Sequence, residues 1–232
     1  MDRFIALLVL LTITGCGSVN TDKVPEDEYV FHDDFYYNSY VDGGKSYLTP
    51  CVDQHYVRFR TKGQKEVIDE LLMRGFTLLS DPAVKNYVCT DGFALPDEIK
   101  YASVVLVEGV GRIDDIPDVI YSHHLYSENG SLFGKSDLLS VYYDVSDPES
   151  QVERILQYAK MHGIYPIYHF PDMGLIVLEC VNASSGNPVE LANWFVEAGG
   201  FVQSFPDSGY TGNAAGKSQL LPMNLCKTSG VK

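Results

Sequence analysis

Histidines are the first residues that could carry chemistry, and the chain has six of them. His123 and His124 are neighbours in an apolar run that is typical of a strand, so we expect their side chains on opposite faces, where they cannot hold one metal ion together. His55, His162 and His169 stand at the edges of predicted elements, with no cysteine or carboxylate at ligand spacing. Each is expected to be a surface histidine or a satisfied core histidine.

Two short motifs invite a test for calcium and phosphate binding. Asp114, Asp115 and Asp118 lack the alternating oxygen ligands and the glycine of an EF-hand, which favours a solvated turn. The segment Gly109-Val110-Gly111 indicates a turn between strands rather than a phosphate-binding loop. The sequence therefore predicts no catalytic residue, no cofactor and no metal site, and an enzyme of an unrecognised class is kept only as the last alternative.

The N-terminus has the pattern of an exported, lipid-anchored protein. Arg3 precedes an apolar run over residues 4–11, and Ile13-Thr14-Gly15-Cys16 follows. This spacing resembles the lipobox of bacterial lipoproteins, which implies removal of residues 1–15 and lipid attachment at Cys16. The alternatives are an ordinary signal peptide with an incidental cysteine, or an anchor helix, for which the run is short.

The expected location is the outer membrane, with contact to the bilayer through the lipid anchor only. Gly17 after the lipidated cysteine implies outer-membrane retention by analogy with sorted lipoproteins. The acidic tether over residues 16–34 is compatible with a cell-surface or a periplasmic orientation. A net charge of −14 argues against nucleic acid as a partner, because phosphates would repel the protein.

Four further cysteines could form disulfides in an oxidising compartment. Cys51, Cys89, Cys180 and Cys226 allow two bridges in three connectivities, and the sequence does not choose among them. No pair has the close spacing of a zinc knuckle or a redox motif. Cys89 and Cys180 lie in apolar runs, where a buried free thiol is an equally good interpretation.

The clearest local structure is a helix followed by a strand over residues 186–207. Asn187 is a good N-cap, and Glu190 stands at the capping-box position three residues later. Gly199-Gly200 predicts a left-handed end to the helix. A strand over residues 201–205 should follow and should end at Pro206-Asp207.

The order of predicted elements defines the expected fold. Residues 136–207 predict the order β-α-β-β-α-β, which is that of a ferredoxin-like unit, and residues 35–135 fit a hairpin followed by a degenerate unit with a collapsed second helix. A short match between Met73-Arg74-Gly75-Phe76 and Met161-His162-Gly163-Ile164 favours a repeat. The prediction is an α+β fold of tandem ferredoxin-like (βαββαβ) units with antiparallel sheets, preceded by a short β-hairpin and followed by a tail over residues 208–232.

The end of the second unit resembles the N-terminal prodomain of secreted and lipid-anchored subtilisin-like serine proteases of Gram-negative bacteria. The matching residues are Gly186-Asn187, Glu190-Leu191-Ala192-Asn193, Phe195, Glu197, Gly199, Phe201 and Pro206-Asp207. The aromatic segment over residues 35–59 is also similar to the opening of that family. No catalytic domain follows residue 207, so the resemblance implies a free-standing, prodomain-like lipoprotein without proteolytic activity.

The resemblance implies that the chain binds, inhibits or assists the folding of a subtilisin-like protease in trans. In such prodomains the sheet face contacts the enzyme, and the C-terminal extension adds a strand along the substrate cleft. Carried over to this chain, the partner-binding strip is Phe205, Pro206, Asp207, Ser208, Gly209 and Tyr210. The alternative is a structural or adhesive surface lipoprotein that reuses the fold with no protease partner.

Overall fold

The computed structural model describes residues 36–38, 44–86, 93, 95–128, 131–213 and 219–220. The predicted signal peptide, the lipidation site Cys16, the tether and most of the tail lie outside the described residues. Cys89 and Cys226 lie outside them as well.

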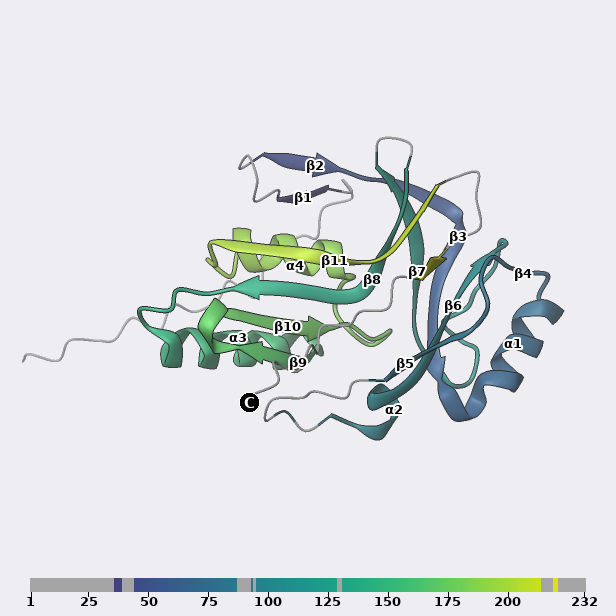
Figure 1. Ribbon diagram of the computed structural model, residues 1–232, viewed down its shortest axis with the longest axis horizontal. Helices are drawn as coiled ribbons and strands as arrows, with labels where there is room; N and C mark the ends of the chain where they lie inside the picture. The colour runs from purple at the N-terminus through teal and green to yellow at the C-terminus, as the bar shows by residue number, and fades with distance from the viewer. Residues whose placement is uncertain are drawn as a thin grey trace, which may run out of the picture.

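The described elements fall into two blocks along the chain (Figure 1). The first block contains β1 (Tyr36–Asn38), β2 (Lys45–Tyr47), β3 (Thr49–Arg60), the 3₁₀ turn η1 (Thr61–Gly63), α1 (Gln64–Met73), β4 (Thr77–Leu78), β5 (Ala83–Asn86), α2 (Asp97–Lys100), β6 (Tyr101–Glu108) and β7 (Val119–Glu128). The second block contains β8 (Ser131–Tyr142), α3 (Pro148–His162), β9 (Tyr165–Phe170), the 3₁₀ turn η2 (Pro171–Met173), β10 (Leu175–Glu179), α4 (Pro188–Glu197), β11 (Gln203–Asn213) and β12 (Gln219–Leu220).

The fold is α+β with antiparallel sheets, as the sequence predicts. β1 and β2 pair with each other, and the other ten described strands form one sheet. In the first block the strands lie in the order β7-β3-β6-β4, and in the second block they lie in the order β11-β8-β10-β9. Figure 1 shows α1 at one end of the molecule and α3 and α4 together at the other.

The two blocks are joined at β8, where the sheet forks. β11 runs along one edge of β8. The opposite edge pairs with β7 at residues 131–133 and with β10 at residues 138–142. Between those segments β8 changes its neighbour, so β7 and β10 diverge on either side of the fork. The sheet is therefore continuous across the two blocks.

The helices of the second block cover one face of its sheet. Tyr158 of α3 and Trp194 of α4 meet edge to face, with ring centroids 5.0 Å apart, in a core that includes alternate residues of β8 and β10. The residues of β8 and β10 on this face are Leu139, Val141, Ile176 and Leu178. Asn187 and Glu190 form the predicted capping box at the start of α4, so local sequence fixes where this helix begins.

The single long helix of the first block packs on the other side of the β3-β6-β7 sheet. Val67 and Leu71, one turn apart on α1, are fully buried in a core with Val57 and Phe59 of β3. The side chain of the next residue, Leu72, is 50% exposed, because it lies about 100° around the helix from Leu71. Residues 109–118 contain turns and no helix, and Ile113 and Ile116 close the core there.

The predicted end of the last strand is wrong. The strand does not stop at Pro206-Asp207 but continues to Asn213, paired with β8. The register of this pairing shifts on both sides of Ser208, and a shift of this kind accommodates a proline that cannot donate to the ladder. Residues 208–213 thus belong to the sheet rather than to a tail, and β12 adds a further pair on Tyr210 and Thr211.

Candidate functional site

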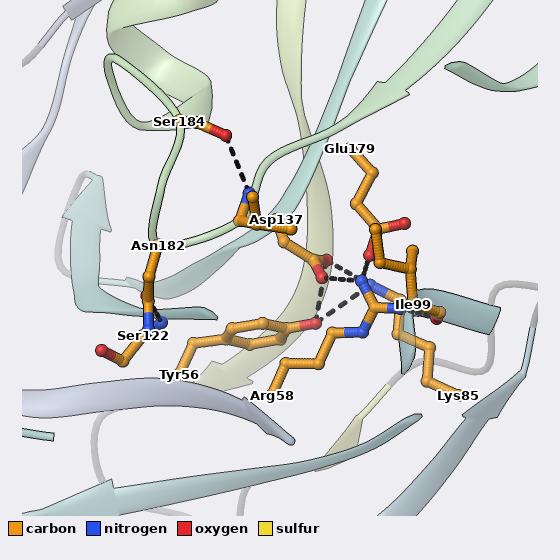
Figure 2. A network of polar contacts seen from close by, with 10 residues as sticks. Tyr56, Arg58, Lys85, Ile99, Ser122, Asp137, Glu179, Asn182 and Ser184 are labelled. Atoms are coloured by element: carbon orange, nitrogen blue, oxygen red, sulfur yellow. Dashed lines mark hydrogen bonds and ion pairs between the residues drawn. The ribbon is translucent and has the colours of Figure 1, made fainter. Parts of the chain in front are cut away.

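Charged side chains from four strands meet inside the fork of the sheet (Figure 2). Arg58 of β3 forms ion pairs with Asp137 of β8 and Glu179 of β10. The Arg58 Nη1 atom lies 2.8 Å from Asp137 Oδ2. The side chains of all three residues have 0% exposure. Arg58 also donates to the backbone carbonyl of Ile99, which fixes its guanidinium from the side of α2.

Lys85 and Tyr56 complete this cluster, which we call the fork network. Lys85 of β5 forms an ion pair with Asp137 and donates to the Tyr56 hydroxyl over 2.9 Å. The Tyr56 hydroxyl in turn donates to Asp137 Oδ1 over 3.1 Å. Two positive and two negative groups therefore balance, and each forms an ion pair, which lowers the cost of burying charge.

The electrostatics keep the central carboxylate ionised. Burial by itself would raise the pKa of Asp137, but the charges of Lys85 and Arg58 outweigh it, and the pKa lies below its usual value. Because Arg58, Asp137 and Glu179 have no exposed surface, a substrate cannot reach them in this conformation. The fork network holds the two blocks together, and its geometry indicates a structural role.

The loop over residues 180–187, between β10 and α4, forms hydrogen bonds with β7. Asn182 accepts a hydrogen bond from the Ser122 backbone through its Oδ1 atom and donates its own N–H to the Ile120 carbonyl (2.9 and 2.8 Å). Ser184 Oγ accepts from the Val181 N–H, which keeps the loop folded (Figure 2). This loop forms one wall of a hollow on the surface of the molecule.

We call this hollow the histidine hollow. Its volume is about 460 Å³, and β7, the loop over residues 109–118 and the start of α4 all contribute to it. Its polar lining includes His55, Arg112, Asp114, Tyr121, His123, His124, Asn182, Asn187 and Glu190. Arg112 is paired with Asp114, so it is partly neutralised at the entrance. Titratable groups from both blocks therefore lie together around this hollow.

The expectation that His55 stands at an element edge is wrong. It lies inside β3, is 7% exposed, and is directly opposite His124 in the β3–β7 register. The two ring centroids are 4.8 Å apart. His55 Nε2 lies 3.2 Å from the carbonyl oxygen of Gly109. His124 Nδ1 is buried and has no hydrogen-bond partner among the described residues.

The environment of these histidines favours their neutral forms. Burial, and then the neighbouring His124, lowers the pKa of His55, and burial lowers the pKa of His124. Burial lowers the pKa of His123 to about 4. The His123 ring stacks on Tyr121 and Tyr126, and its Nδ1 atom lies 3.2 Å from the Tyr126 hydroxyl.

Each of the remaining described histidines has a hydroxyl group within hydrogen-bond distance of one ring nitrogen. His162 Nδ1 lies 2.6 Å from the Ser185 hydroxyl, and His169 Nε2 lies 2.7 Å from that of Tyr143. Within the described ranges, no group of three or more histidine, cysteine, aspartate or glutamate side chains has the arrangement of a metal site.

Of the four cysteines considered for disulfides, two lie in the described residues, and both are free thiols. Cys51 is half-buried on β3. Cys180 is fully buried against the helices of the second block, and burial raises the pKa of its thiol well above the ordinary value. A thiol of this kind is a core residue rather than a nucleophile.

The partner-binding strip predicted over residues 205–210 lies entirely on β11. Phe205 stacks on Tyr142 of β8 with ring centroids 5.6 Å apart and an interplanar angle of 30°. Pro206 is buried, and the backbone of residues 207–210 continues the strand. The strip is therefore held by the sheet instead of extending from it.

None of the helices within the described ranges is both long and apolar enough to cross a bilayer. The sequence matches no family model and no curated protein.

Proposed function

We propose that the chain is a non-catalytic outer-membrane lipoprotein, built from tandem ferredoxin-like units, that binds a subtilisin-like protease in trans. Within each block the described strand order supports this assignment. The sheet order of a ferredoxin-like unit places its four strands as fourth, first, third and second. The order β7-β3-β6-β4 in the first block and the order β11-β8-β10-β9 in the second block both follow this pattern. The first block keeps this order without a second helix, because α2 precedes β6.

The observation that carries the proposal is an aromatic surface on the face of the second sheet opposite α3 and α4. Tyr142, Phe170 and Phe205 lie there half-buried, on strands whose other faces pack against the helices. Part of this face is covered by Leu95 and Ile99. The side toward β11 keeps the Tyr142–Phe205 stack at the surface, and half-exposed aromatic groups are typical anchors of protein interfaces.

This surface fits the way in which prodomains of the resembling family contact their enzymes, through the sheet face. The strip over residues 205–210 begins at Phe205, so the aromatic surface and the strip form one continuous area along β11. In this proposal the strip meets the protease from a fixed strand. Binding would block the substrate cleft or stabilise the folded protease, while lipidation at Cys16 would hold the complex at the outer membrane.

The test is binding and inhibition by the purified protein against subtilisin-like proteases secreted by the same organism. We expect slowed turnover by at least one protease, and loss of that effect in the double variant Tyr142→Ser/Phe205→Ser. Val110→Ser is the matched control, because Val110 is 88% exposed and lies on the loop over residues 109–118 of the other block. Circular dichroism of both variants checks that the fold is retained.

Truncated variants for this test should retain the whole of β11. Removal of all residues after Asp207 would take away half of β11, whereas removal after Asn213 leaves the strand complete. If no protease in the panel binds or is slowed, the proposal fails and the structural or adhesive role becomes the better account. A subtilisin-like gene without a prodomain of its own beside this one would support the proposal.

A further inference from the structure

The pairing of His55 with His124 has the dimensions of a two-imidazole metal site. A metal–nitrogen bond is about 2.0–2.1 Å long, and the centre of an imidazole ring lies about 1 Å beyond its nitrogen. Two rings bound to one ion at angles of about 90–110° therefore have centres about 4.5–5 Å apart. The observed separation of 4.8 Å falls within this range.

The hydrogen bonding of the two rings leaves nitrogen lone pairs for an ion. The Gly109 carbonyl can only accept, so at 3.2 Å the Nε2 atom of His55 carries the proton. The lone pair of His55 is thus on Nδ1. An N–H donated to a backbone carbonyl is the usual support of a metal-binding histidine, because it fixes the tautomer and the ring orientation. Nδ1 of His124 is buried without a partner among the described residues, which is costly unless a ligand satisfies it.

The surroundings have room and the right charge for a hydrated cation. Both rings line the histidine hollow, whose volume of about 460 Å³ is large enough for several water molecules. Glu190 and the ion pair of Asp114 with Arg112 also line it, so one negative charge of the lining is not offset, and the chain carries a net charge of −14. Neither carboxylate completes a three-ligand group with the histidines, so water must fill the remaining coordination positions.

We propose that His55 and His124 together bind one divalent transition-metal ion at the histidine hollow. Imidazole ligands suit copper, nickel and zinc, and among the divalent ions of this row copper binds such a site most tightly. With two protein ligands and open positions, the site is one for acquiring or presenting an ion rather than for a permanent structural metal. Metal binding at this site does not require a protease partner.

The experiment titrates the purified, chelator-treated protein with Cu²⁺ and reads binding by calorimetry and by electron paramagnetic resonance. Two equatorial imidazole nitrogens should give a characteristic nitrogen hyperfine pattern at one equivalent of Cu²⁺. His55→Gln and His124→Gln should each weaken this binding by about a hundredfold, because each removes one arm of a two-point attachment. Glutamine keeps a polar side chain of similar length, which limits the effect on the fold.

His169→Gln is the matched control, because His169 lies on β9 and bonds to Tyr143 away from the hollow. It should leave the affinity and the spectrum of the tight site unchanged. His123→Gln tests whether a third imidazole takes part, and the proposal expects no change. If His55→Gln and His124→Gln, verified as folded by circular dichroism, bind Cu²⁺ as the unaltered protein does, the site does not exist.

Discussion

Arg58 and Asp137 form a fully buried ion pair that joins the two blocks of the chain. They are 79 residues apart in sequence, and they meet where β8 exchanges β7 for β10 as its neighbour. A fork in a sheet interrupts the ladder of backbone hydrogen bonds that would otherwise join neighbouring strands. The fork network places two cations and two carboxylates at this point, and their charges offset one another across the two blocks.

Removal of the central cation should destabilise the protein strongly. Arg58→Met leaves Glu179 without its only described ion-pair partner, and it leaves Asp137 with the ion pair to Lys85 and the hydrogen bond from Tyr56. Breaking a buried pair in this way costs about 3–5 kcal/mol, because an uncompensated charge remains inside. We expect a loss of this size in the free energy of unfolding measured with urea.

The matched control for that prediction is an exposed ion pair. Lys65 and Asp69 on α1 are 82% and 52% exposed in their side chains. Lys65→Ala should change the free energy of unfolding by less than about 1 kcal/mol, since solvent screens such pairs. Similar losses for the two variants would show that the fork network contributes nothing beyond an ordinary surface contact.

The features that sequence predicts well here are those determined by neighbouring residues. The capping box of α4 follows from Asn187 and Glu190, and the structure contains both of its hydrogen bonds. The left-handed Gly163 that ends α3 follows from the conformational freedom of glycine. The order of helices and strands from β8 to β11 was predictable for the same reason.

The features that sequence misses depend on which strands pair and in what register. Nothing near His55 indicates that His124 will stand opposite, because the β3–β7 register includes two irregularities. The fork network needs the branching of β8, which periodicity cannot reveal. Pro206 was a reasonable strand end by local rules, but pairing with β8 on one side carries the strand past it.

Acid should destabilise the protein through His123. Its pKa is about 4 in the folded state against an ordinary value of 6.5, so between these values the unfolded chain binds a proton that the folded chain does not. The contribution of His123 to the free energy of unfolding is therefore fully present above about pH 6.5. It falls by about 1.4 kcal/mol per pH unit as the pH is lowered toward 4. Urea unfolding at several pH values measures this slope.

The control for the acid prediction is His123→Gln, which has no titrating ring. From about pH 6.5 to 4.5 the free energy of unfolding of the unaltered protein should fall by about 2–3 kcal/mol more than that of the variant. Chelator in all samples removes any contribution from metal at the histidine hollow. Parallel pH profiles for the two proteins would show that His123 is not held neutral by the fold.

Loss of the α4 cap should have a moderate cost. The Asn187 side chain accepts hydrogen bonds from the backbone N–H groups of Val189 and Glu190, at 2.8 and 3.1 Å. Asn187→Ala removes both and should lower the free energy of unfolding by about 1–2 kcal/mol. Asn187→Asp keeps an acceptor at the same place and should restore most of the stability. A full loss in both variants would assign the effect to packing rather than to capping.

Two glycines with the same backbone conformation should respond differently to a methyl group. Gly163 and Gly174 have φ values of 64° and 60°, so alanine is strained at both. A Cβ atom at Gly163 would meet nothing closer than 3.5 Å, whereas at Gly174 it would lie 2.6 Å from the Tyr143 carbonyl oxygen. Gly163→Ala should therefore lower the free energy of unfolding by only about 1–2 kcal/mol, which is the cost of the left-handed conformation for alanine.

Gly174→Ala should cost about 1–3 kcal/mol more, because the β8 end of the chain must move to relieve the overlap. The Tyr143 N–H donates to the Gly174 carbonyl over 2.8 Å, so this movement also strains a backbone hydrogen bond. Thermal and urea unfolding of both variants measure the difference. If both variants lose the same free energy of unfolding, the turn between β9 and β10 moves away from Tyr143 without cost, and the close contact at Gly174 does not stabilise the second block.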